Sequence, residues 1–267
     1  MRIGIIGAGG KMGHALITEI LSHPKLQLSG GVVQAGNADI GRDLGELAGT
    51  AKAGAKLSAN LEDLVKKSEA VIDFSSPEAT TTAVKLTAQY KKIHIIGTTG
   101  LSDSQKKGLE KAAKKTVIVF SPNMSVGVNI LMALTGKVAK IVDDSYDIEI
   151  LEMHHGHKKD APSGTSLGLG RAAAEGRGVD LSEVAKRTRD GIIGERKKGE
   201  IGFAALRGGD VVGDHTVIFA GSGERIELTH KAGNRAIYAS GAVRAALWAK
   251  GKKHGLYSMQ DVLDLNA

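Results

Sequence analysis

The segment RIGIIGAGGKMG, Arg2–Gly13, predicts the fold with which the chain begins. Arg2–Ile6 has the apolar pattern of a short strand, and an amphipathic helix follows the glycines and ends near Pro24. A strand, a glycine-rich turn and a helix in this order open a dinucleotide-binding fold. The glycines permit a tight turn, let the backbone approach a pyrophosphate, and let the helix pack closely on the sheet. The segment therefore indicates cofactor binding at the start of the chain.

The glycine spacing differs from the usual G-x-G-x-x-G, because Met12 stands where the third glycine would fall. The turn instead has glycines at positions 7, 10 and 13. The next strand, Leu26–Val33, ends in Val33-Gln34 and lacks the carboxylate that normally binds the adenosine ribose. Nothing there rejects a 2′-phosphate, and Lys11 is placed to attract one. We expect NADH or NADPH as the cofactor, with the preference left open and tolerance of NADP favoured.

Strands and helices alternate from the N-terminus to about residue 125. Apolar strands are predicted at Ala70–Phe74, His94–Gly97 and Thr116–Phe120. A helix that begins with a capping box of Ser102 and Gln105 separates the last two. This alternation requires a parallel, doubly wound sheet, that is, a Rossmann-like α/β domain. Ligands bind at the carboxyl ends of such strands, so we expect the turns that follow them to face one cofactor.

A second informative segment is EILEMHHGHKKDAPSGT, Glu149–Thr165. It predicts a strand, then a cationic loop, then a helix start at Ser163-Gly164-Thr165, where free N–H groups bind anions. Together these groups describe a pocket for a substrate with more than one carboxylate. A solvated basic loop is the alternative, but imidazoles, lysines and a helix start converge here and favour function. The cationic residues are His154, His155, His157, Lys158 and Lys159.

The pattern changes after Asn123. Val126–Val142 is a long apolar helix. Strands without intervening helices are predicted at Ile201–Arg207, His215–Phe219 and Arg225–His230, which implies an antiparallel or mixed sheet in a second, mixed α/β domain. We place a dinucleotide-binding domain at 1–125 and a substrate domain at 126–233. Residues 234–267 are expected to pack back on the first domain.

Composition and charge exclude several classes of protein. The chain has 267 residues and no cysteine, which excludes disulfides and thiolate metal sites and fits a reducing cytoplasm. The net charge of +7 comes from scattered lysines, and aromatics are only 3% of residues, so the stacking surfaces of nucleic-acid binders are missing. No stretch approaches the ~20 apolar residues that span a bilayer, and no signal-peptide pattern begins the chain. We expect a soluble cytoplasmic protein that binds neither nucleic acid nor membrane.

These segments together resemble the 4-hydroxy-tetrahydrodipicolinate reductase (dihydrodipicolinate reductase) family over nearly the whole chain. The resemblance implies a Rossmann-like cofactor domain joined to a mixed α/β domain that binds substrate and assembles a homotetramer. It also implies hydride transfer from NADH or NADPH to a cyclic unsaturated dicarboxylate in lysine and diaminopimelate biosynthesis. The matching segments are GAGGKMG (7–13), VIDFSSPE (71–78), GTTG (97–100), SPNMSVGVN (121–129), EMHHGHKKDAPSGT (152–165), GFAALRGGDVVGDHT (202–216) and ERIELTHKA (224–232).

The resemblance also assigns roles to individual residues. His154 corresponds to the acid/base histidine and Lys158 to the catalytic lysine, while His155, Gly164 and Thr165 correspond to substrate-binding residues. Well-known members of the family carry a glutamate and an arginine where this chain has Val33 and Gln34, so those two assignments do not carry over. The cofactor contacts correspond to Gly7, Ala8, Gly9, Gly10, Lys11, Met12, Gly97, Thr98, Thr99, Ser121, Pro122, Asn123 and Met124.

Two other functions fit parts of the sequence. A metal hydrolase would use His154, His155 and His157. On an extended strand, however, His154 points away from the other two, and no acidic residue follows at a familiar zinc spacing, so no metal is expected. A non-catalytic redox sensor that only binds dinucleotide explains the first domain and leaves the cationic segment unexplained.

Overall fold

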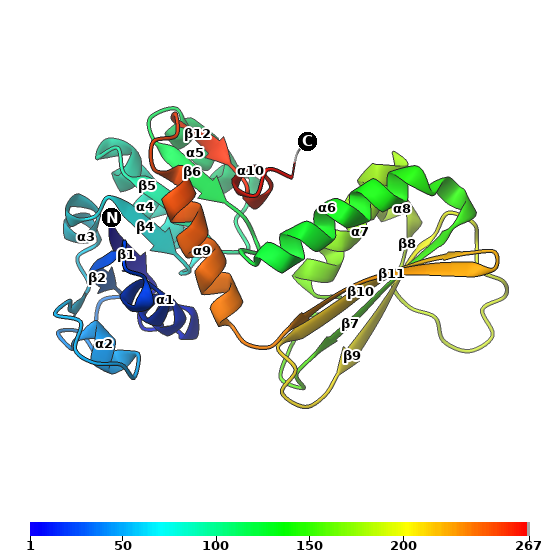
Figure 1. Ribbon diagram of the computed structural model, residues 1–267, viewed down its shortest axis with the longest axis horizontal. Coiled ribbons are helices and arrows are strands. Elements are labelled where there is room, and N and C mark those ends of the chain that lie inside the picture. The colour runs from blue at the N-terminus through cyan, green and yellow to red at the C-terminus, as the bar shows by residue number, and fades with distance from the viewer. Residues whose placement is uncertain (266–267) are drawn as a thin grey trace. The chain divides into compact units, whose positions relative to one another are not determined.

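The computed structural model describes residues 1–265 of the chain. They form two compact units, one made of Met1–Val126 and the residues from Arg235 on, the other of Gly127–Asn234 (Figure 1). We call them the first unit and the second unit. The last two residues of the predicted C-terminal segment, 266–267, lie outside the described residues.

A seven-stranded parallel sheet forms the centre of the first unit, with the strand order β12-β6-β5-β4-β1-β2-β3. The predicted doubly wound sheet is therefore confirmed. The edge strand β12 comes from the C-terminal segment and pairs with β6, which the alternation near the N-terminus does not indicate. The strands are β1 (Arg2–Ile6), β2 (Gln27–Val32), β3 (Leu57–Ser58), β4 (Ala70–Asp73), β5 (Ile93–Ile96), β6 (Val117–Phe120) and β12 (Gly255–Tyr257).

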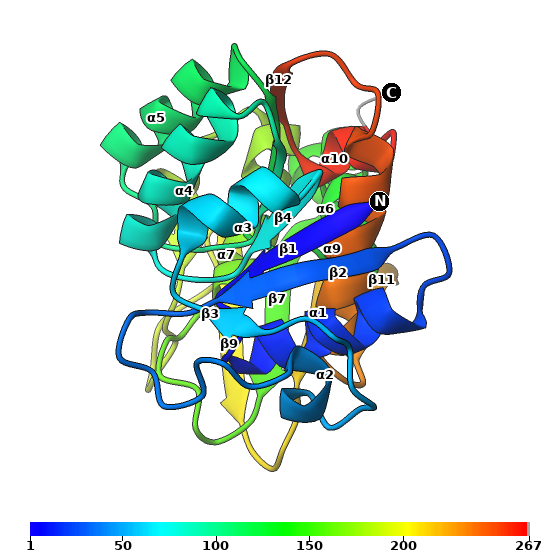
Figure 2. The same cartoon turned by 90° about the vertical axis from the view of Figure 1, so that its left-hand side faces the viewer.

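Helices cover both faces of this sheet (Figure 2). Alternate residues of a strand point to opposite faces. Ile3 and Ile5 of β1 accordingly pack in one cluster with α1 and α9, whereas Ile6 packs in another with α3 and α4. The helices are α1 (Lys11–Ser22), α2 (Leu44–Leu47), α3 (Leu61–Lys67), α4 (Pro77–Gln89), α5 (Asp103–Ala113), α9 (Ala236–Ala249) and α10 (Met259–Val262).

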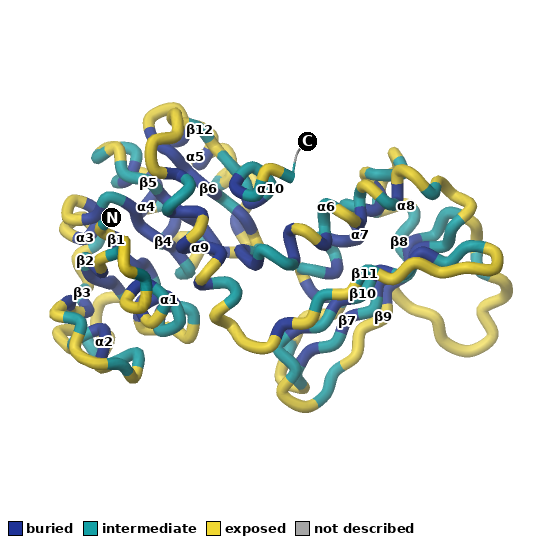
Figure 3. Tube along the Cα trace, viewed as in Figure 1, coloured by how far each residue is buried: buried dark blue, intermediate teal, exposed yellow. Residues whose placement is uncertain are grey.

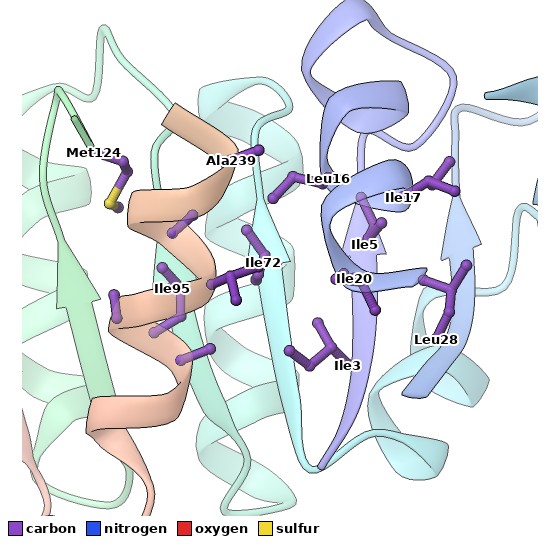
Figure 4. Packing of buried hydrophobic residues seen from close by; sticks show 14 of the residues in the cluster. Ile3, Ile5, Leu16, Ile17, Ile20, Leu28, Ile72, Ile95, Met124 and Ala239 are labelled. Atoms are coloured by element: carbon purple, nitrogen blue, oxygen red, sulfur yellow. The ribbon is translucent and has the colours of Figure 1, made fainter. Parts of the chain in front are cut away.

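The largest core cluster lies between the sheet and the helices α1 and α9 (Figure 4). Ile72 and Ile95, from neighbouring strands, point toward α9. The helix carries small residues such as Ala239 and Gly241 on this side, so its backbone approaches closely. A side chain at Gly241 would meet the carbonyl of Met124, and any larger residue there would separate the helix from the segment that follows β6.

Several helices begin at the capping residues that the sequence predicts. The Ser102 hydroxyl caps α5, and Gln105 completes the predicted capping box. Ser76 caps α4 by accepting the N–H of Ala79, and Pro77 occupies the first helical turn, where its missing N–H costs nothing. These caps set the ends of the helices at the carboxyl edge of the sheet.

A five-stranded mixed sheet forms the second unit, in the order β11-β10-β7-β9-β8. β10 is antiparallel to β11 and β7, while β7, β9 and β8 run parallel, so of the two predicted arrangements the mixed one is found. The elements are α6 (Val126–Ile141), a 3₁₀ turn η1 (Asp143–Ser145), β7 (Asp147–His154), α7 (Gly164–Arg177), α8 (Leu181–Val184), β8 (Ala185–Lys186), β9 (Ile201–Arg207), β10 (Gly213–Gly221) and β11 (Glu224–Ala232).

Helices α6, α7 and α8 cover one face of the mixed sheet. Ile148 and Ile150 of β7 and Phe219 of β10 are buried beneath them. The opposite face carries no helix in residues 127–234, and Figure 3 shows exposed residues along β9 and β11. Leu206 lies there with 48% of its surface exposed.

Helix α7 begins at the helix start that the sequence predicts. Ser163 is its N-cap, since the Ser163 hydroxyl accepts the N–H of Ser166, and the helix runs from Gly164. It ends at Arg177, and the residue that follows as the C-cap is Gly178, whose φ of 69° suits a glycine. In the described residues, no helix has both the length and the apolar character that crossing a membrane requires.

Candidate active site

The buried face of β7 changes from apolar to charged before the strand ends. Burial alternates along the strand, so Ile148, Ile150, Glu152 and His154 all point inward. Glu152 is only 1% exposed and His154 8% exposed. A buried carboxylate and a buried imidazole cost free energy unless they have partners, and their partners define this site.

Glu152 has four hydrogen-bond contacts with three other residues. Both of its oxygens accept from the Arg207 guanidinium, at 2.9 Å each, and one also accepts the Ser163 N–H at 3.1 Å. The other oxygen lies against His154 Nδ1. Burial works to raise the pKa of Glu152, but the bonds from Arg207 and His154 outweigh it and hold that pKa below its usual value. The carboxylate is therefore ionised at neutral pH.

His154 occupies the last position of β7 with one ring nitrogen already engaged. An ionised carboxylate only accepts hydrogen bonds, so Nδ1 carries the proton toward Glu152 and Nε2 is left for another partner. Burial lowers the pKa of His154, and Glu152 only partly restores it. Gly213 makes room for the ring, since a Cβ atom there would lie 2.9 Å from Nε2.

A second buried histidine supports the same network. His215 stands opposite Glu152 in the β7–β10 pairing, and its Nε2 is 3.1 Å from the Ser163 hydroxyl. Burial lowers the pKa of His215 to about 4, with the neighbouring His154 adding to the effect. His215 is therefore neutral at pH 7 and acts as a hydrogen-bonding and packing residue.

The loop after β7 carries the remaining predicted substrate residues. The His155 N–H donates to the Val211 carbonyl at 2.8 Å, which holds the start of the loop. The Lys158 ammonium is 2.8 Å from the Asp160 carboxylate, and this pairing lowers the pKa of Asp160. Gly164 and Thr165 form the first turn of α7. His154, His155, Lys158, Gly164 and Thr165 thus all lie in one short segment of the second unit, from the end of β7 to the first turn of α7.

The predicted cofactor residues lie in the first unit, beginning with the turn between β1 and α1. Gly7 has φ +84°, and a Cβ there would lie 2.6 Å from the Phe74 carbonyl oxygen. A Cβ at Gly13 would lie 2.5 Å from the Gly7 oxygen, so this glycine lets α1 pack against the turn. Gly10 caps α1 without a side-chain bond, and the first turn holds Lys11 and no acid. Free N–H groups beside a lysine suit a pyrophosphate.

Several other predicted cofactor residues use their side chains inside the fold. The Thr98 hydroxyl is 2.9 Å from that of Thr80 and accepts the Ser75 N–H at 3.1 Å. Met124 is buried in the main core cluster, and the Ser121 hydroxyl donates to a nearby carbonyl. These residues keep only their main chain for a ligand. Ala8 is likewise buried, Met12 packs against the core, and Gly97 lies against the Phe74 ring. The exposed residues are Gly9, Thr99 and Pro122, and Asn123 is half-buried.

The side of the turn at Gly9 has a neighbour that the sequence does not indicate. A Cβ at Gly9 would lie 3.0 Å from Val33 and 4.0 Å from the Asn37 amide nitrogen. Asn37 is neutral and exposed, and its side-chain oxygen accepts the Asp39 N–H. The position where many dinucleotide-binding proteins have a carboxylate thus has apolar and amide groups beside the turn.

Glu152, His154 and His215 could together hold a metal ion, since their ligand atoms lie within 4.8 Å of one another. This trio shares only His154 with the histidines of the metal-hydrolase alternative. Arg207 and the Ser163 N–H donate to Glu152. They already use both of its carboxylate oxygens, and Arg207 adds positive charge. This donor set favours a hydrogen-bonded network over a metal centre.

Sequence reasoning missed Glu152, Arg207 and His215 as site residues. A signal for Glu152 was present, because it is in phase with the buried residues Ile148 and Ile150. Arg207 and His215 lie 55 and 63 residues further on and come close only through strand pairing: Arg207 pairs with His154 on β9, and His215 with Glu152 on β10. Nothing local in the sequence marks that register.

Two family models together match nearly the whole chain, and the second also covers residues 235–263, which the structure places in the first unit. Residues 1–124 match the family model "Dihydrodipicolinate reductase, N-terminus", and residues 127–263 match "Dihydrodipicolinate reductase, C-terminus". The 4-hydroxy-tetrahydrodipicolinate reductase of Rhodopseudomonas palustris (strain BisB18) is 53% identical over 100% of this chain and 98% of its own length. The enzyme of the same name from Ruegeria sp. (strain TM1040) is 52% identical over 98% of each chain.

A solved structure shows the same fold. It is the dipicolinate-bound dihydrodipicolinate reductase from Paenisporosarcina sp. TG-14, with a TM-score of 0.77 over 98% of each chain. Its sequence identity to this chain is 24%, so it bears on the fold alone.

Proposed function

The chain belongs to the dihydrodipicolinate reductase family, and from that membership we propose the part that each site residue plays in the reaction. The enzyme reduces 4-hydroxy-tetrahydrodipicolinate to tetrahydrodipicolinate with hydride from a nicotinamide dinucleotide, a step of lysine and diaminopimelate biosynthesis. The observation that carries the assignment of roles is the buried pair of His154 and Glu152 at the start of a cationic loop.

His154 is the general acid in this proposal. The net reaction adds a hydride, which a bound nicotinamide cofactor would supply, and a proton, and it releases the 4-hydroxyl group as water. His154 keeps Nδ1 on Glu152, so Nε2 is the atom that delivers the proton. Burial lowers the pKa of His154, which makes its imidazolium a readier donor than an exposed one.

Lys158, His155 and the start of α7 hold the two substrate carboxylates in this proposal. The Lys158 ammonium already binds the Asp160 carboxylate at 2.8 Å, so it has the position and charge to bind a substrate carboxylate in its place. The first turn of α7, at Gly164 and Thr165, has the N–H groups and partial charge that suit the other. Lys158 also favours release of the proton from His154, because its charge lowers the pKa of that imidazole.

The cofactor binds the first unit in this proposal, with its pyrophosphate at Gly7–Lys11 and the start of α1. The uncapped helix start and the tight turn at Gly7 support this placement. We propose that the site accepts both NADH and NADPH, because Val33 and Asn37 beside the turn bring no negative charge.

The test is turnover. Purified protein with freshly generated substrate should oxidise both NADH and NADPH, followed by loss of the absorbance of the reduced nicotinamide, and the product should be identified by mass spectrometry. Cofactor oxidation that does not depend on the substrate would contradict the proposal. Binding of dinucleotide without any turnover would favour the non-catalytic sensor.

We further propose that the subunits assemble as a homotetramer through the face of the mixed sheet that α6 and α7 leave uncovered. Leu206 on that face is 48% exposed, and its neighbour across the strands, Met153, is apolar. Leu206→Lys should lower the molar mass measured by sedimentation. Leu256→Lys is the matched control, since Leu256 is 41% exposed on β12 of the first unit. A monomeric wild-type protein would contradict the proposed assembly and would not contradict the proposed reaction.

A further inference from the structure

The Glu152 carboxylate connects two parts of the second unit that serve the reaction differently. Through one oxygen it contacts His154 Nδ1, at the end of β7. Through the other it accepts the N–H of Ser163, the residue that caps α7. The same carboxylate therefore touches the proposed proton donor and the proposed carboxylate-binding helix start.

Arg207 is the third partner of this carboxylate. Its two terminal nitrogens donate to the two oxygens of Glu152 at 2.9 Å, in the paired geometry that fixes a carboxylate plane. One of them also donates to the Asp160 carbonyl at 2.7 Å, within the cationic loop. Arg207 thus ties β9, β7 and the loop to one another.

We propose that Glu152 and Arg207 are positioning residues for His154. Glu152 holds the imidazole with Nδ1–H directed inward and Nε2 available to the substrate, and Arg207 holds Glu152 in the orientation that does so. Neither residue exchanges a proton or touches the substrate. The inference rests on the proposed role of His154 as the general acid.

A second arginine–carboxylate pair on the same strand provides the comparison. Glu149 accepts from Arg189 at 2.7 and 2.8 Å and from Arg196 at 3.1 Å. It lies on the other face of β7 and is more exposed than Glu152. Its hydrogen-bond and ion-pair partners are these two arginines, and neither is a titrating imidazole. Glu149 is therefore a matched control for Glu152, since it is an arginine-paired carboxylate on the same strand without an imidazole partner.

Three charged groups and one neutral ring, from four segments, lie near His154. Glu152 of β7 favours the protonated imidazole, while Lys158 of the loop and Arg207 of β9 disfavour it. His215 of β10 packs edge to face against the ring and is neutral near pH 7. Removing the charge of Glu152 and removing that of Arg207 should therefore move the titration of His154 in opposite directions. An ion pair remote from the imidazole, such as that of Glu149, should shift it in neither direction.

The first experiment follows His154 by NMR of the full-length protein labelled with ¹⁵N-histidine, with the signal assigned by its loss in His154→Gln. In the wild type, Nδ1 should carry the proton of the neutral ring. Glu152→Gln should abolish that preference and lower the pKa of His154, whereas Arg207→Met should raise it. Glu149→Gln should change neither. Equal effects of Glu152→Gln and Glu149→Gln, or shifts in one direction for Glu152→Gln and Arg207→Met, would overturn the proposal.

The second experiment separates positioning from substrate binding. Glu152→Gln should lower kcat by roughly 10²-fold with KM nearly unchanged, and Glu149→Gln should leave both near wild type. Gly213→Ala offers an independent route, because its Cβ would press on His154 at 2.9 Å from Nε2 without changing any charge. It should lower kcat and leave KM near wild type.

The proposed function and the positioning role can be contradicted independently of one another. A wild-type protein without turnover would defeat the proposed function, yet the NMR titration would still decide whether Glu152 orients His154. Normal kcat in both Glu152→Gln and Gly213→Ala would defeat the positioning role while the reductase activity stands. If Glu152→Gln does not fold, Arg207→Met still tests the shift in the pKa of His154, and Gly213→Ala still tests the fall in kcat.

Discussion

His154 and His215 meet edge to face, with ring centroids 5.1 Å apart and ring planes at 76°. Both rings are buried, and burial lowers the pKa of each. Two adjacent imidazolium ions would repel one another, so at most one of the rings is charged at a time. Glu152 contacts only His154 of the two, which makes His154 the ring that takes up and releases the proton.

The first prediction concerns that proton. His154→Gln keeps a polar side chain of similar size and removes the transferable proton, so kcat should fall by roughly 10²- to 10⁴-fold with a smaller change in KM. Steady-state kinetics on folded, cofactor-binding protein measures this. His157→Gln, an exposed histidine of the same loop, is the control and should stay near wild type. Near-normal kcat in His154→Gln would mean that Lys158 or water delivers the proton.

The second prediction concerns the carboxylates of the substrate. Lys158→Met removes the charge that binds one of them, at a cost of about 2–3 kcal/mol in transition-state binding, so both kcat and KM should worsen. Lys159→Met is the control, because Lys159 is adjacent and exposed. Thr165→Val removes a hydroxyl and keeps the backbone N–H, so it should chiefly raise KM. Equal losses in Lys158→Met and Lys159→Met would reduce the effect to the net charge of the loop.

The third prediction concerns pH and stability. The pKa of His215 is about 4 in the folded chain and near 6.5 when unfolded, so only the unfolded chain binds the proton between these values. The free energy of unfolding should therefore decrease as pH falls from about 6.5 to 4, by roughly 3 kcal/mol from this residue. Urea titrations across this range should show a shallower decrease for His215→Gln. His254→Gln, at an exposed position, should keep the wild-type slope.

The fourth prediction concerns the glycine turn. Gly7→Ala places a Cβ 2.6 Å from the Phe74 carbonyl oxygen and forces alanine to φ +84°. Gly251→Ala has almost the same φ, +82°, with nothing within 4 Å, so it should cost only about 1 kcal/mol of backbone strain. Gly7→Ala should be more destabilising and should weaken dinucleotide binding, measured by thermal unfolding and calorimetry. Equal Tm values in the two variants would show that the turn has room to adjust.

The fifth prediction concerns the cofactor. With no carboxylate at Val33-Gln34, the Kd values of NADH and NADPH should differ by about tenfold or less, or ~1.4 kcal/mol. Lys11→Met should weaken NADPH more than NADH if the lysine attracts the 2′-phosphate. Calorimetric titration of each cofactor into both proteins decides this. A preference for NADH of a thousandfold would mean that an acidic group elsewhere binds the ribose.

Much of the first unit could be predicted because its signals are local. The strand and turn at Arg2–Gly13 and the capping box of Ser102 and Gln105 depend on residues close together in the chain, and each is found in the structure. The edge strand β12 was missed. Gly255–Tyr257 is short, and it becomes a strand only because it pairs with β6.

In the candidate site, too, local features could be predicted and contacts between distant residues could not. By itself, the sequence determined that a strand runs into a cationic loop and a helix start, since hydrophobic alternation and capping residues act over a few positions. Only the tertiary structure decided that Arg207 holds Glu152 and that His215 meets Ser163. These pairs are 55 and 52 residues apart, and the register of β9 and β10 on β7 brings them together. That register results from packing of the whole sheet against its helices, and a shift by one residue would turn these side chains to the other face.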